Sequence, residues 1–369
     1  MKTGLYLHIP FCKQKCNYCD FASFAGREFL IDAYVDALLT EAARAPRTPC
    51  QTLYIGGGTP SLLPLAAWEK LVAGVEKFFG PVANFAESTV EANPESLTKE
   101  KINFLRGAGF NRLSIGLQSF HDAELKTLGR VHTQADFLRA YENARAAGFN
   151  NINVDLIAGL PGQTLESFLQ SLQAVAALEP EHLSVYGLEI EEGTPFFERG
   201  VICDQVLMRQ MLEQTHAQLS AAGFEHYEIS NYARPGFASQ HNRNYWQYGE
   251  YIGLGSAAAS FMGGVRRQNT PDPTQYIEKI NGGQSAVCFE ETLDGPAREG
   301  EKLLLALRQL GGTEPTEKQA GYFAHEIEKH VQNGLLERDG KKVKLTQEGI
   351  FLANEVFRSF VEPFEDICK

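Results

Sequence analysis

Six short apolar segments, each followed by a longer stretch of polar and apolar residues, constrain the fold of this 369-residue chain most strongly. The apolar segments lie at residues 4–9, 52–55, 88–92, 112–116, 152–157 and 183–188. Helical periodicity follows at residues 30–44, 65–79, 99–108, 137–147 and 165–178. This alternation predicts right-handed βαβ units and a parallel sheet. We therefore predict an α/β fold with a partial (β/α)6 TIM-like barrel, short of a closed eight-stranded one.

The C-terminal part of the chain has a different pattern. A helix at about residues 297–308, a second after Pro315 and a third near residues 323–332 precede a hairpin signal with Asp339-Gly340 at its turn. Three helices and a hairpin predict a winged-helix-like α+β domain. The third helix lacks the basic face that groove binding requires, which favours a structural module. We predict a barrel at residues 1–235, a barrel-capping segment at 236–290 and the winged-helix-like domain at 291–369.

Composition narrows the range of partners. The formal net charge of −12 argues against non-specific binding to nucleic acid or to an anionic membrane surface. No apolar run approaches the roughly 20 residues that span a bilayer. The N-terminus runs directly into the first apolar segment, without a signal or transit pattern. We therefore expect a cytoplasmic protein without a transmembrane segment, in a reducing compartment that suits free thiols.

Three cysteines follow the first predicted strand, in the pattern Cys12-Lys-Gln-Lys-Cys16-Asn-Tyr-Cys19. Three thiolates can hold three irons of a [4Fe–4S] cluster and leave the fourth iron open for chemistry. Zinc, with His8 or Cys50 as a fourth ligand, is an alternative. A disulfide is disfavoured because the cysteine count is odd and no secretory signal is present. The remaining thiols are interpreted as buried or incidental: Cys50, Cys203, Cys288 and Cys368.

Polar or glycine-rich motifs follow each of the first five predicted strands. After the three cysteines come Gly56-Gly57-Gly58-Thr59-Pro60-Ser61, Glu91-Ala-Asn-Pro, Gly116-Leu-Gln118-Ser-Phe and Asp155-Leu-Ile-Ala-Gly-Leu-Pro161-Gly. The carboxyl ends of parallel barrel strands meet at one mouth, where the active sites of such barrels lie. The sequence therefore predicts that these motifs form one site.

Together these motifs resemble the radical S-adenosylmethionine (SAM) superfamily, and the resemblance covers nearly the whole chain. Within it the chain looks like the branch that contains oxygen-independent coproporphyrinogen III oxidase and its heme-chaperone relatives. The resemblance implies that Cys12, Cys16 and Cys19 hold a [4Fe–4S] cluster. It also implies that SAM chelates the open iron through its amino and carboxylate groups, where one electron can cleave it to a 5′-deoxyadenosyl radical.

The same resemblance implies further SAM-binding residues. Tyr18 would stack on adenine, and Gly56, Gly57 and Gly58 would admit the methionyl amino group. The positions that match the ribose and carboxylate contacts of the oxidase branch are Glu91, Gln118, Arg130 and Asp155. Tyr6 and Thr59 belong to the first two motifs and are counted with them. The alternatives are ordinary packing for Tyr18, a tight strand–helix turn for the glycines, and strand-end caps or surface ion pairs for the four ribose and carboxylate positions; for an isolated residue such a structural role is the more common one.

Two departures separate this chain from the oxidases. The oxidases carry Cys-Gly-Cys at the end of the cysteine motif, whereas this chain has Cys19-Asp20-Phe21. It also begins only a few residues before the first predicted strand, without the N-terminal extension of the oxidases. Both features are similar to those of the heme-chaperone relatives, and they place coproporphyrinogen decarboxylation in doubt.

A second motif favours the same branch. The segment Gln240-His241-Asn242-Arg243-Asn244-Tyr245-Trp246 resembles a His-Asn-x-x-Tyr-Trp element that is linked to heme in the chaperones. The resemblance implies that His241 is an axial heme ligand, since a neutral imidazole suits heme iron. A buried, hydrogen-bonded histidine beside a core tryptophan is the alternative. Ala259 stands where many relatives have a histidine, so no second ligand is expected there.

We therefore predict a radical-SAM-fold heme chaperone that binds a [4Fe–4S] cluster, SAM and heme and delivers heme to acceptor hemoproteins. The alternative is an oxygen-independent coproporphyrinogen III oxidase that uses SAM radical chemistry. A zinc-binding structural or nucleic-acid protein is a third, weaker hypothesis. A reductant protein such as flavodoxin or ferredoxin and transient contact with membrane-bound acceptors are further expected partners; nucleic acid is not.

Overall fold

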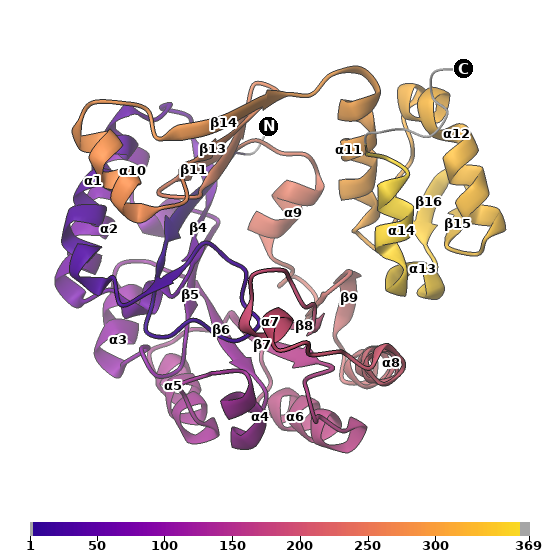
Figure 1. The fold of residues 1–369 in the computed structure, drawn as a ribbon, viewed down its shortest axis with the longest axis horizontal. Helices are drawn as coiled ribbons and strands as arrows, with labels where there is room; N and C mark the ends of the chain where they lie inside the picture. The colour runs from indigo at the N-terminus through magenta and orange to yellow at the C-terminus, as the bar shows by residue number, and fades with distance from the viewer. Residues whose placement is uncertain (1–2, 362–369) are drawn as a thin grey trace.

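The computed structural model describes residues 3–361, so Cys368 lies outside the described residues. Its main feature is a twelve-stranded sheet in the order β14-β13-β12-β11-β1-β4-β5-β6-β7-β8-β10-β9. The sheet curves, and helices cover its outer side, as in an incompletely closed barrel (Figure 1). Within residues 3–361 no helix is both long and apolar enough to cross a membrane.

The centre of the sheet is the predicted six-stranded parallel unit. Its strands are β1 (Thr3–Ile9), β4 (Cys50–Gly57), β5 (Glu87–Ala92), β6 (Arg112–Gln118), β7 (Ile152–Ala158) and β8 (His182–Gly187). The helices between them are α1 (Ile31–Arg44), α2 (Leu65–Phe79), α3 (Lys99–Gly107), α4 (Asp122–Thr127), α5 (Gln134–Ala146) and α6 (Leu165–Ala177). The predicted (β/α)6 fold class is therefore confirmed, with α4 as an additional short helix that the periodicity did not reveal.

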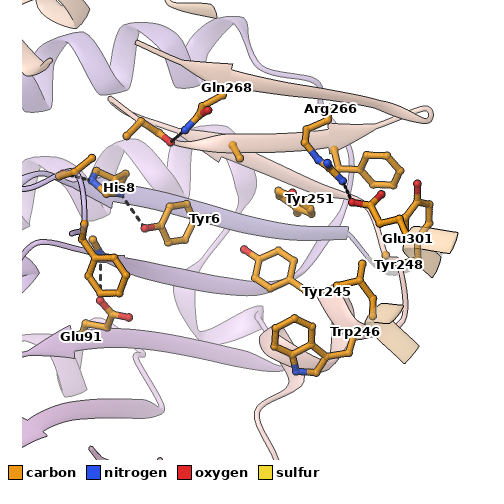
Figure 2. A pocket seen from close by; sticks show the side chains of 18 residues that line it. Tyr6, His8, Glu91, Tyr245, Trp246, Tyr248, Tyr251, Arg266, Gln268 and Glu301 are labelled. Carbon is orange, nitrogen blue, oxygen red and sulfur yellow. Dashed lines mark hydrogen bonds and ion pairs between the residues drawn. The ribbon is translucent and has the colours of Figure 1, made fainter. Parts of the chain in front are cut away.

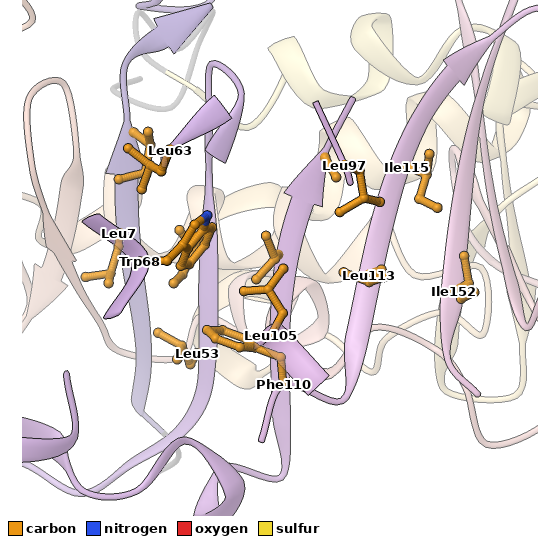
Figure 3. Close-up of a cluster of buried hydrophobic side chains, with 14 of the residues drawn as sticks. Leu7, Leu53, Leu63, Trp68, Leu97, Leu105, Phe110, Leu113, Ile115 and Ile152 are labelled. Carbon is orange, nitrogen blue, oxygen red and sulfur yellow. The ribbon is translucent and has the colours of Figure 1, made fainter. Parts of the chain in front are cut away.

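The barrel core forms where helices pack on the outer face of the sheet. Leu53 on β4 and Leu113 on β6 are fully buried, with β5 between the two strands, and Trp68 of α2 packs edge-on against Phe110 at a centroid distance of 5.9 Å (Figure 3). Burying one such large apolar side chain stabilises a fold by about 1.5–3 kcal/mol. This core explains the near-continuous apolar runs, because both faces of a parallel sheet are covered.

Both edges of the parallel unit are extended by segments that the sequence pattern did not reveal. After β8 come α7 (Pro195–Glu198), α8 (Gln205–Ala221), β9 (Glu225–Glu228), β10 (Asn231–Ala233) and α9 (Gln240–Trp246). They are followed by β11 (Tyr251–Leu254), β12 (Ala259–Met262), β13 (Val265–Asn269), α10 (Pro273–Asn281) and β14 (Val287–Thr292). These strands are short and partly polar, so neither alternation nor an apolar run marks them.

Short elements complete the barrel. They are β2 (Phe11–Cys12), β3 (Phe24–Ala25) and the 3-10 helices Glu28–Leu30, Pro60–Leu62 and Val82–Asn84. β2 and β3 pair with each other in a small sheet of their own, which closes the loop that carries the cysteine motif.

The C-terminal part combines helices with a hairpin, as expected for a winged-helix-like unit. Its elements are α11 (Gly295–Leu307), α12 (Glu317–Gln332), β15 (Leu336–Asp339), β16 (Lys342–Leu345), α13 (Gln347–Phe351) and α14 (Ala353–Arg358). It has an apolar core of its own, which includes Leu303, Phe323 and Phe360. The exact domain boundaries stay a prediction.

Two details of this part correct the sequence-based expectation. The second and third predicted helices are joined in α12, which is kinked at Phe323, where φ is −122° and ψ is 17°. Thr316 and Gln319 cap its start by bonding each other's backbone amides. In the hairpin Asp339 pairs with Lys342, so Gly340 and Lys341 form the turn rather than Asp339 and Gly340.

Candidate functional site

A cavity of about 1360 Å³ opens at the carboxyl ends of the parallel strands. We call it the thiol cavity, because Cys12, Cys16 and Cys19 all line it. The other predicted site residues in its wall are Tyr18, Gly57, Gly58, Thr59, Glu91, Gln118, Arg130 and Asp155. The structure thus brings together Arg130 and ten residues that the sequence places at five different strand ends. Tyr6, Gly56 and His241 are not part of this wall.

The three thiols are free and differ in exposure. Cys12 is buried in β2, whereas Cys16 and Cys19 are half-buried in the loop that follows. Burial raises the pKa of the thiols of Cys12 and Cys19. Within residues 3–361, no three His, Cys, Asp or Glu side chains are arranged as ligands of one metal ion. A [4Fe–4S] cluster does not require three ligands around one ion, because each of its three cysteine thiolates bonds a different iron.

A continuous set of hydrogen bonds connects two of these thiols. Thr59 Oγ1 donates to Cys12 Sγ at 3.6 Å, and Asn93 Nδ2 donates to Thr59 Oγ1 at 3.0 Å. Arg130 Nη2 donates to Asn93 Oδ1 at 2.7 Å, and its Nη1 donates to Cys16 Sγ at 3.6 Å. Donors aimed at sulfur favour thiolates and orient them for a metal. The donor set therefore fits an anionic iron–sulfur cluster.

Asn93 is the residue in this network that the sequence analysis missed as a site residue. It belongs to Glu91-Ala-Asn-Pro, the motif that pointed to Glu91, so its position at a strand end was the available signal. Its amide both donates to Thr59 and accepts from Arg130. No spacing rule distinguishes such a connecting residue from an ordinary strand-end cap.

The end of β4 lies against the cysteine loop. Gly57 has a φ of +114°, which disfavours any side chain, and its amide donates to Glu91 Oε2 at 3.1 Å. A Cβ at Gly58 would lie 2.7 Å from the carbonyl oxygen of Phe11 and 3.0 Å from Cys12 Sγ. The absence of side chains thus lets the β4 backbone lie directly beside the Cys12 thiol. A small group of a ligand bound at this thiol could therefore contact the backbone.

The end of β6 is strained at Gln118. Its φ is +75°, a conformation that non-glycine residues rarely adopt, and the β6–β7 register shifts between Gly116 and Gln118. The carbonyl of Gly116 accepts a hydrogen bond from Arg130 Nη2 at 2.6 Å. A strained backbone conformation of this kind persists only where the surrounding contacts enforce it, and such residues are frequent at functional sites. It turns the Gln118 side chain into the wall of the thiol cavity.

Two carboxyl groups sit deeper in the mouth. Burial raises the pKa of Glu91 to about 7, although Tyr54 Oη donates to Glu91 Oε1 at 2.6 Å and opposes that shift. Burial also raises the pKa of Asp155, whose Oδ1 accepts from Asn153 Nδ2 at 2.7 Å. Carboxylates in such a place can accept hydrogen bonds from ligand hydroxyls.

A second cavity of about 590 Å³ adjoins the first, and seven of its eighteen wall residues are Phe, Tyr or Trp. We call it the aromatic cavity; it is lined by Tyr6, Tyr245, Trp246, Tyr248, Tyr251 and Phe261 among others. In Figure 2, Tyr6, Tyr245 and Tyr251 lie between His8 and Glu91 at one end and Arg266 and Glu301 at the other. The two cavities share three wall residues: Phe21, Gly57 and Glu91.

Phe21 therefore stands where the two cavities meet. Its side chain is 64% exposed, although it is a large apolar residue next to the cysteine motif. The same residue is one of the two positions at which the motif departs from the oxidase pattern. The departure thus lies at the junction of the two cavities rather than at a remote surface.

His241 does not reach either cavity. It is 1% exposed on α9, its Nδ1 lies 2.8 Å from Thr52 Oγ1 and its Nε2 lies 2.8 Å from Tyr245 Oη. Burial lowers its pKa to about 3, so the ring is neutral. Because both ring nitrogens have partners, direct iron ligation requires Tyr245 to move. In the structure His241 is a buried, hydrogen-bonded histidine. A role as heme ligand stays a prediction.

His8 is also unavailable to the thiols. Its Nδ1 lies 2.9 Å from Tyr6 Oη and its Nε2 lies 2.9 Å from the carbonyl of Ala22. Burial lowers its pKa, which keeps the ring neutral. The ring links β1 to the loop after the cysteine motif and contributes to the wall of the aromatic cavity.

Comparison with known proteins identifies the family. The model of the radical SAM superfamily matches residues 6–175. The heme chaperone HemW of Bacillus subtilis is 36% identical and aligns over 98% of this chain and 99% of its own. The heme chaperone HemW of Escherichia coli is 45% identical over 74% of this chain and 75% of its own. The chain belongs to the HemW family.

The HemW family fold is also that of a solved oxidase. The structure of coproporphyrinogen III oxidase (HemN) from Escherichia coli, described as a radical SAM enzyme, superimposes with a TM-score of 0.86 and 26% identity. It covers 98% of this chain and 90% of the oxidase. The likeness confirms the predicted radical SAM barrel with its C-terminal unit. Membership of the superfamily implies a [4Fe–4S] cluster and SAM, whose residues are the subject of the proposal below.

Proposed function

We propose that this protein is a heme chaperone that holds a [4Fe–4S] cluster and SAM in the thiol cavity and carries heme in the aromatic cavity. The observation that carries the proposal is the contact between the two cavities at Phe21, Gly57 and Glu91. One cavity has the donor set of a cluster site, and the other has the apolar, aromatic wall that a planar macrocycle prefers. Relatives along nearly the whole chain bear the name heme chaperone HemW.

In this proposal Cys12, Cys16 and Cys19 would bond three irons and leave the fourth for SAM. The cluster would supply the electron for any SAM cleavage; the protein supplies position and excludes water. The Gly57–Gly58 backbone would contact the methionyl amino group, and Arg130 its carboxylate. Tyr18 would cover adenine, and the carboxyl oxygens of Glu91 and Asp155 would accept from the ribose hydroxyls. Gln118 and Thr59 complete the wall, and Gly56 keeps β4 close to Glu91.

The cargo would lie between the aromatic side chains of the aromatic cavity. A volume of about 590 Å³ falls within the range of about 300–1,000 Å³ for small-molecule sites. Tyr6 and Tyr245 present phenol groups to it, and tyrosine is one of the known heme ligands. His241 would act by holding Tyr245, through the bond from Tyr245 Oη to Nε2.

The oxidase is the second candidate, because the solved oxidase shares the fold over nearly the whole chain. The Asp20-Phe21 pair, where the oxidases have Gly-Cys, favours the chaperone. A reductant protein such as flavodoxin or ferredoxin, acceptor hemoproteins including membrane-bound ones, and a cytoplasmic location with reduced thiols complete the proposal.

The test uses anaerobically reconstituted protein in two parallel assays. One supplies coproporphyrinogen III, SAM and a reductant and measures protoporphyrinogen IX. The other titrates heme and measures its transfer to an apo-hemoprotein. We expect stoichiometric heme binding and transfer without turnover. Formation of protoporphyrinogen IX would overturn the chaperone assignment in favour of the oxidase.

A further inference from the structure

Arg266 is the one arginine or lysine among the described residues that line the aromatic cavity. It lies on β13, and its side chain is 29% exposed. Its Nη1 lies 3.4 Å from Glu291 Oε2, and its Nη2 contacts Glu301 Oε1. Figure 2 shows Arg266 and Glu301 together at the end of the cavity opposite Glu91.

The partner Glu301 comes from a different part of the fold. It lies on α11, at the start of the C-terminal part, and its side chain is 14% exposed. Its second oxygen, Oε2, is buried without a well-formed hydrogen bond, and Tyr248 lies beside this carboxylate: burial, with the charge of Glu301, raises the pKa of Tyr248. A buried carboxylate oxygen without a well-formed hydrogen bond costs free energy. One oxygen of Glu301 is therefore paired with Arg266, whereas the other has no well-formed hydrogen bond.

We propose that Arg266 binds the carboxylate side chains of the porphyrin cargo, and that Glu301 occupies this position when the cavity holds no cargo. The inference rests on the proposed function and deepens it, because it assigns the orientation and specificity of the cargo. A carboxylate-bearing planar macrocycle would place its ring between the tyrosines and its carboxylates at Arg266. Among the described lining residues no arginine or lysine lies at the opposite end beside Glu91, which disfavours the reverse orientation.

The exchange replaces the Glu301 carboxylate by one carboxylate of the cargo on the same guanidinium, so the charge in direct contact with Arg266 is conserved. Arg–carboxylate pairs are among the strongest charge-assisted hydrogen bonds, because the planar fork matches two oxygens. Glu291, the more exposed partner, stays on its own strand β14 next to β13. The Glu301 side chain turns away from Arg266 when the cargo binds and returns when the cargo leaves.

The neighbouring residue offers a matched control. Arg267 follows Arg266 on β13 and pairs with Glu290 at 2.6 Å, but neither residue lines the cavity. Successive side chains of a strand point to opposite faces, so Arg267 has the same chemistry on the wrong side. Substitution of either arginine changes the net charge and the stability of β13 in the same way, so only a change specific to Arg266 reports on the cavity.

The experiment compares heme with heme dimethyl ester, in which both carboxylates are blocked, on reconstituted full-length protein. We expect the unmodified protein to prefer heme about tenfold or more, which is what a charge-assisted pair provides. Arg266→Gln should abolish the preference. Glu301→Gln should tighten heme binding and leave ester binding unchanged, because it removes a competitor. Arg267→Gln and Glu290→Gln should change neither.

Three results would overturn the inference. They are equal affinity of the unmodified protein for heme and ester, equal weakening of both by Arg266→Gln, or weaker heme binding in Glu301→Gln. The last result is independent of whether Arg266→Gln folds, since a purely structural Glu301 would lower affinity rather than raise it. If neither porphyrin binds, the proposed function itself fails and this inference with it.

Discussion

Around the cysteine motif, individual side chains act through shared hydrogen bonds. Arg130 contacts Cys16, Asn93 and the Gly116 carbonyl at once, so it fixes a thiol, a strand end and a connecting amide. Such outer partners of a metal ligand set its orientation and charge. We therefore expect the hydrogen bonds of Arg130 to determine how tightly a cluster is retained.

Arg130→Gln should weaken cluster binding by roughly 10–100-fold, the usual effect of removing an outer partner of a metal ligand. Iron content and visible absorbance after anaerobic reconstitution, titrated with a chelator, measure it. Arg139→Gln is the control, because Arg139 is 65% exposed and pairs only with Asp136 at the surface among the described residues. Equal chelator sensitivity of the two variants would contradict the prediction.

Glu91 predicts a pH dependence of the unfolding free energy. Its pKa is raised to about 7 in the folded protein, against 4.5 as its ordinary value. The folded state therefore binds more protons, and the contribution to stability is complete below about pH 4.5 and lost as the pH rises through about 7. The loss amounts to about 3 kcal/mol.

Denaturant unfolding of the cofactor-free protein between pH 4.5 and 8 measures this slope. Glu91→Gln should flatten it, whereas Glu142→Gln, at an exposed position of α5, should leave it unchanged. An unchanged slope in Glu91→Gln would show that Glu91 does not carry the effect.

At the scale of elements, the position of α9 decides how the aromatic cavity is built. Glu87 on β5 accepts bonds from the amides of Gln240 and His241, both at 2.9 Å, and from Ser239 Oγ at 3.2 Å. A carboxylate at a helix N-terminus also complements the helix dipole. Glu87 therefore anchors the helix that carries Tyr245 and Trp246.

Glu87→Gln should loosen α9 without disturbing the thiols, because an amide offers one acceptor oxygen where three donors converge. We expect a loss of about 1–3 kcal/mol in local stability. Hydrogen exchange should show faster exchange in α9 and unchanged exchange in the cysteine loop, with reduced heme retention. Slower or unchanged exchange in α9 would refute the anchoring role.

At the scale of the whole molecule, Arg308 joins the C-terminal part to the barrel. Its guanidinium lies 4.4 Å from the ring centroid of Trp246 and 3.8 Å from Glu228 Oε2. Glu228 is 1% exposed, and burial raises its pKa. The apolar cores of the barrel and of the C-terminal part are separate clusters, so polar contacts such as those of Arg308 help to hold the two parts together.

Arg308→Ala should weaken the attachment of the C-terminal part to the barrel by about 2 kcal/mol, because it leaves Glu228 buried beside no cation and removes the stack on Trp246. Thermal unfolding should show the C-terminal part melting earlier than the barrel. Arg298→Ala, at an exposed position of the same helix α11, is the control and should melt like the unmodified protein. A single unchanged transition in Arg308→Ala would contradict the prediction.

The sequence by itself determined the six parallel strands, five of the helices between them and the group of motifs at one mouth. It could do so because apolar runs, helical periodicity and strand-end motifs are local signals, and βαβ handedness then fixes where strand ends lie. It also singled out Asp20-Phe21, which the structure places at the junction of the two cavities.

Tertiary structure alone decided the rest. The short, partly polar strands β9–β14 form because neighbouring strands offer hydrogen-bond partners, which no local sequence pattern records. The same holds for Asn93, which connects two motifs, and for His241, whose imidazole faces Thr52 and Tyr245 instead of a cavity. A residue type indicates which bonds a side chain can make; the packing around it decides which of them are made.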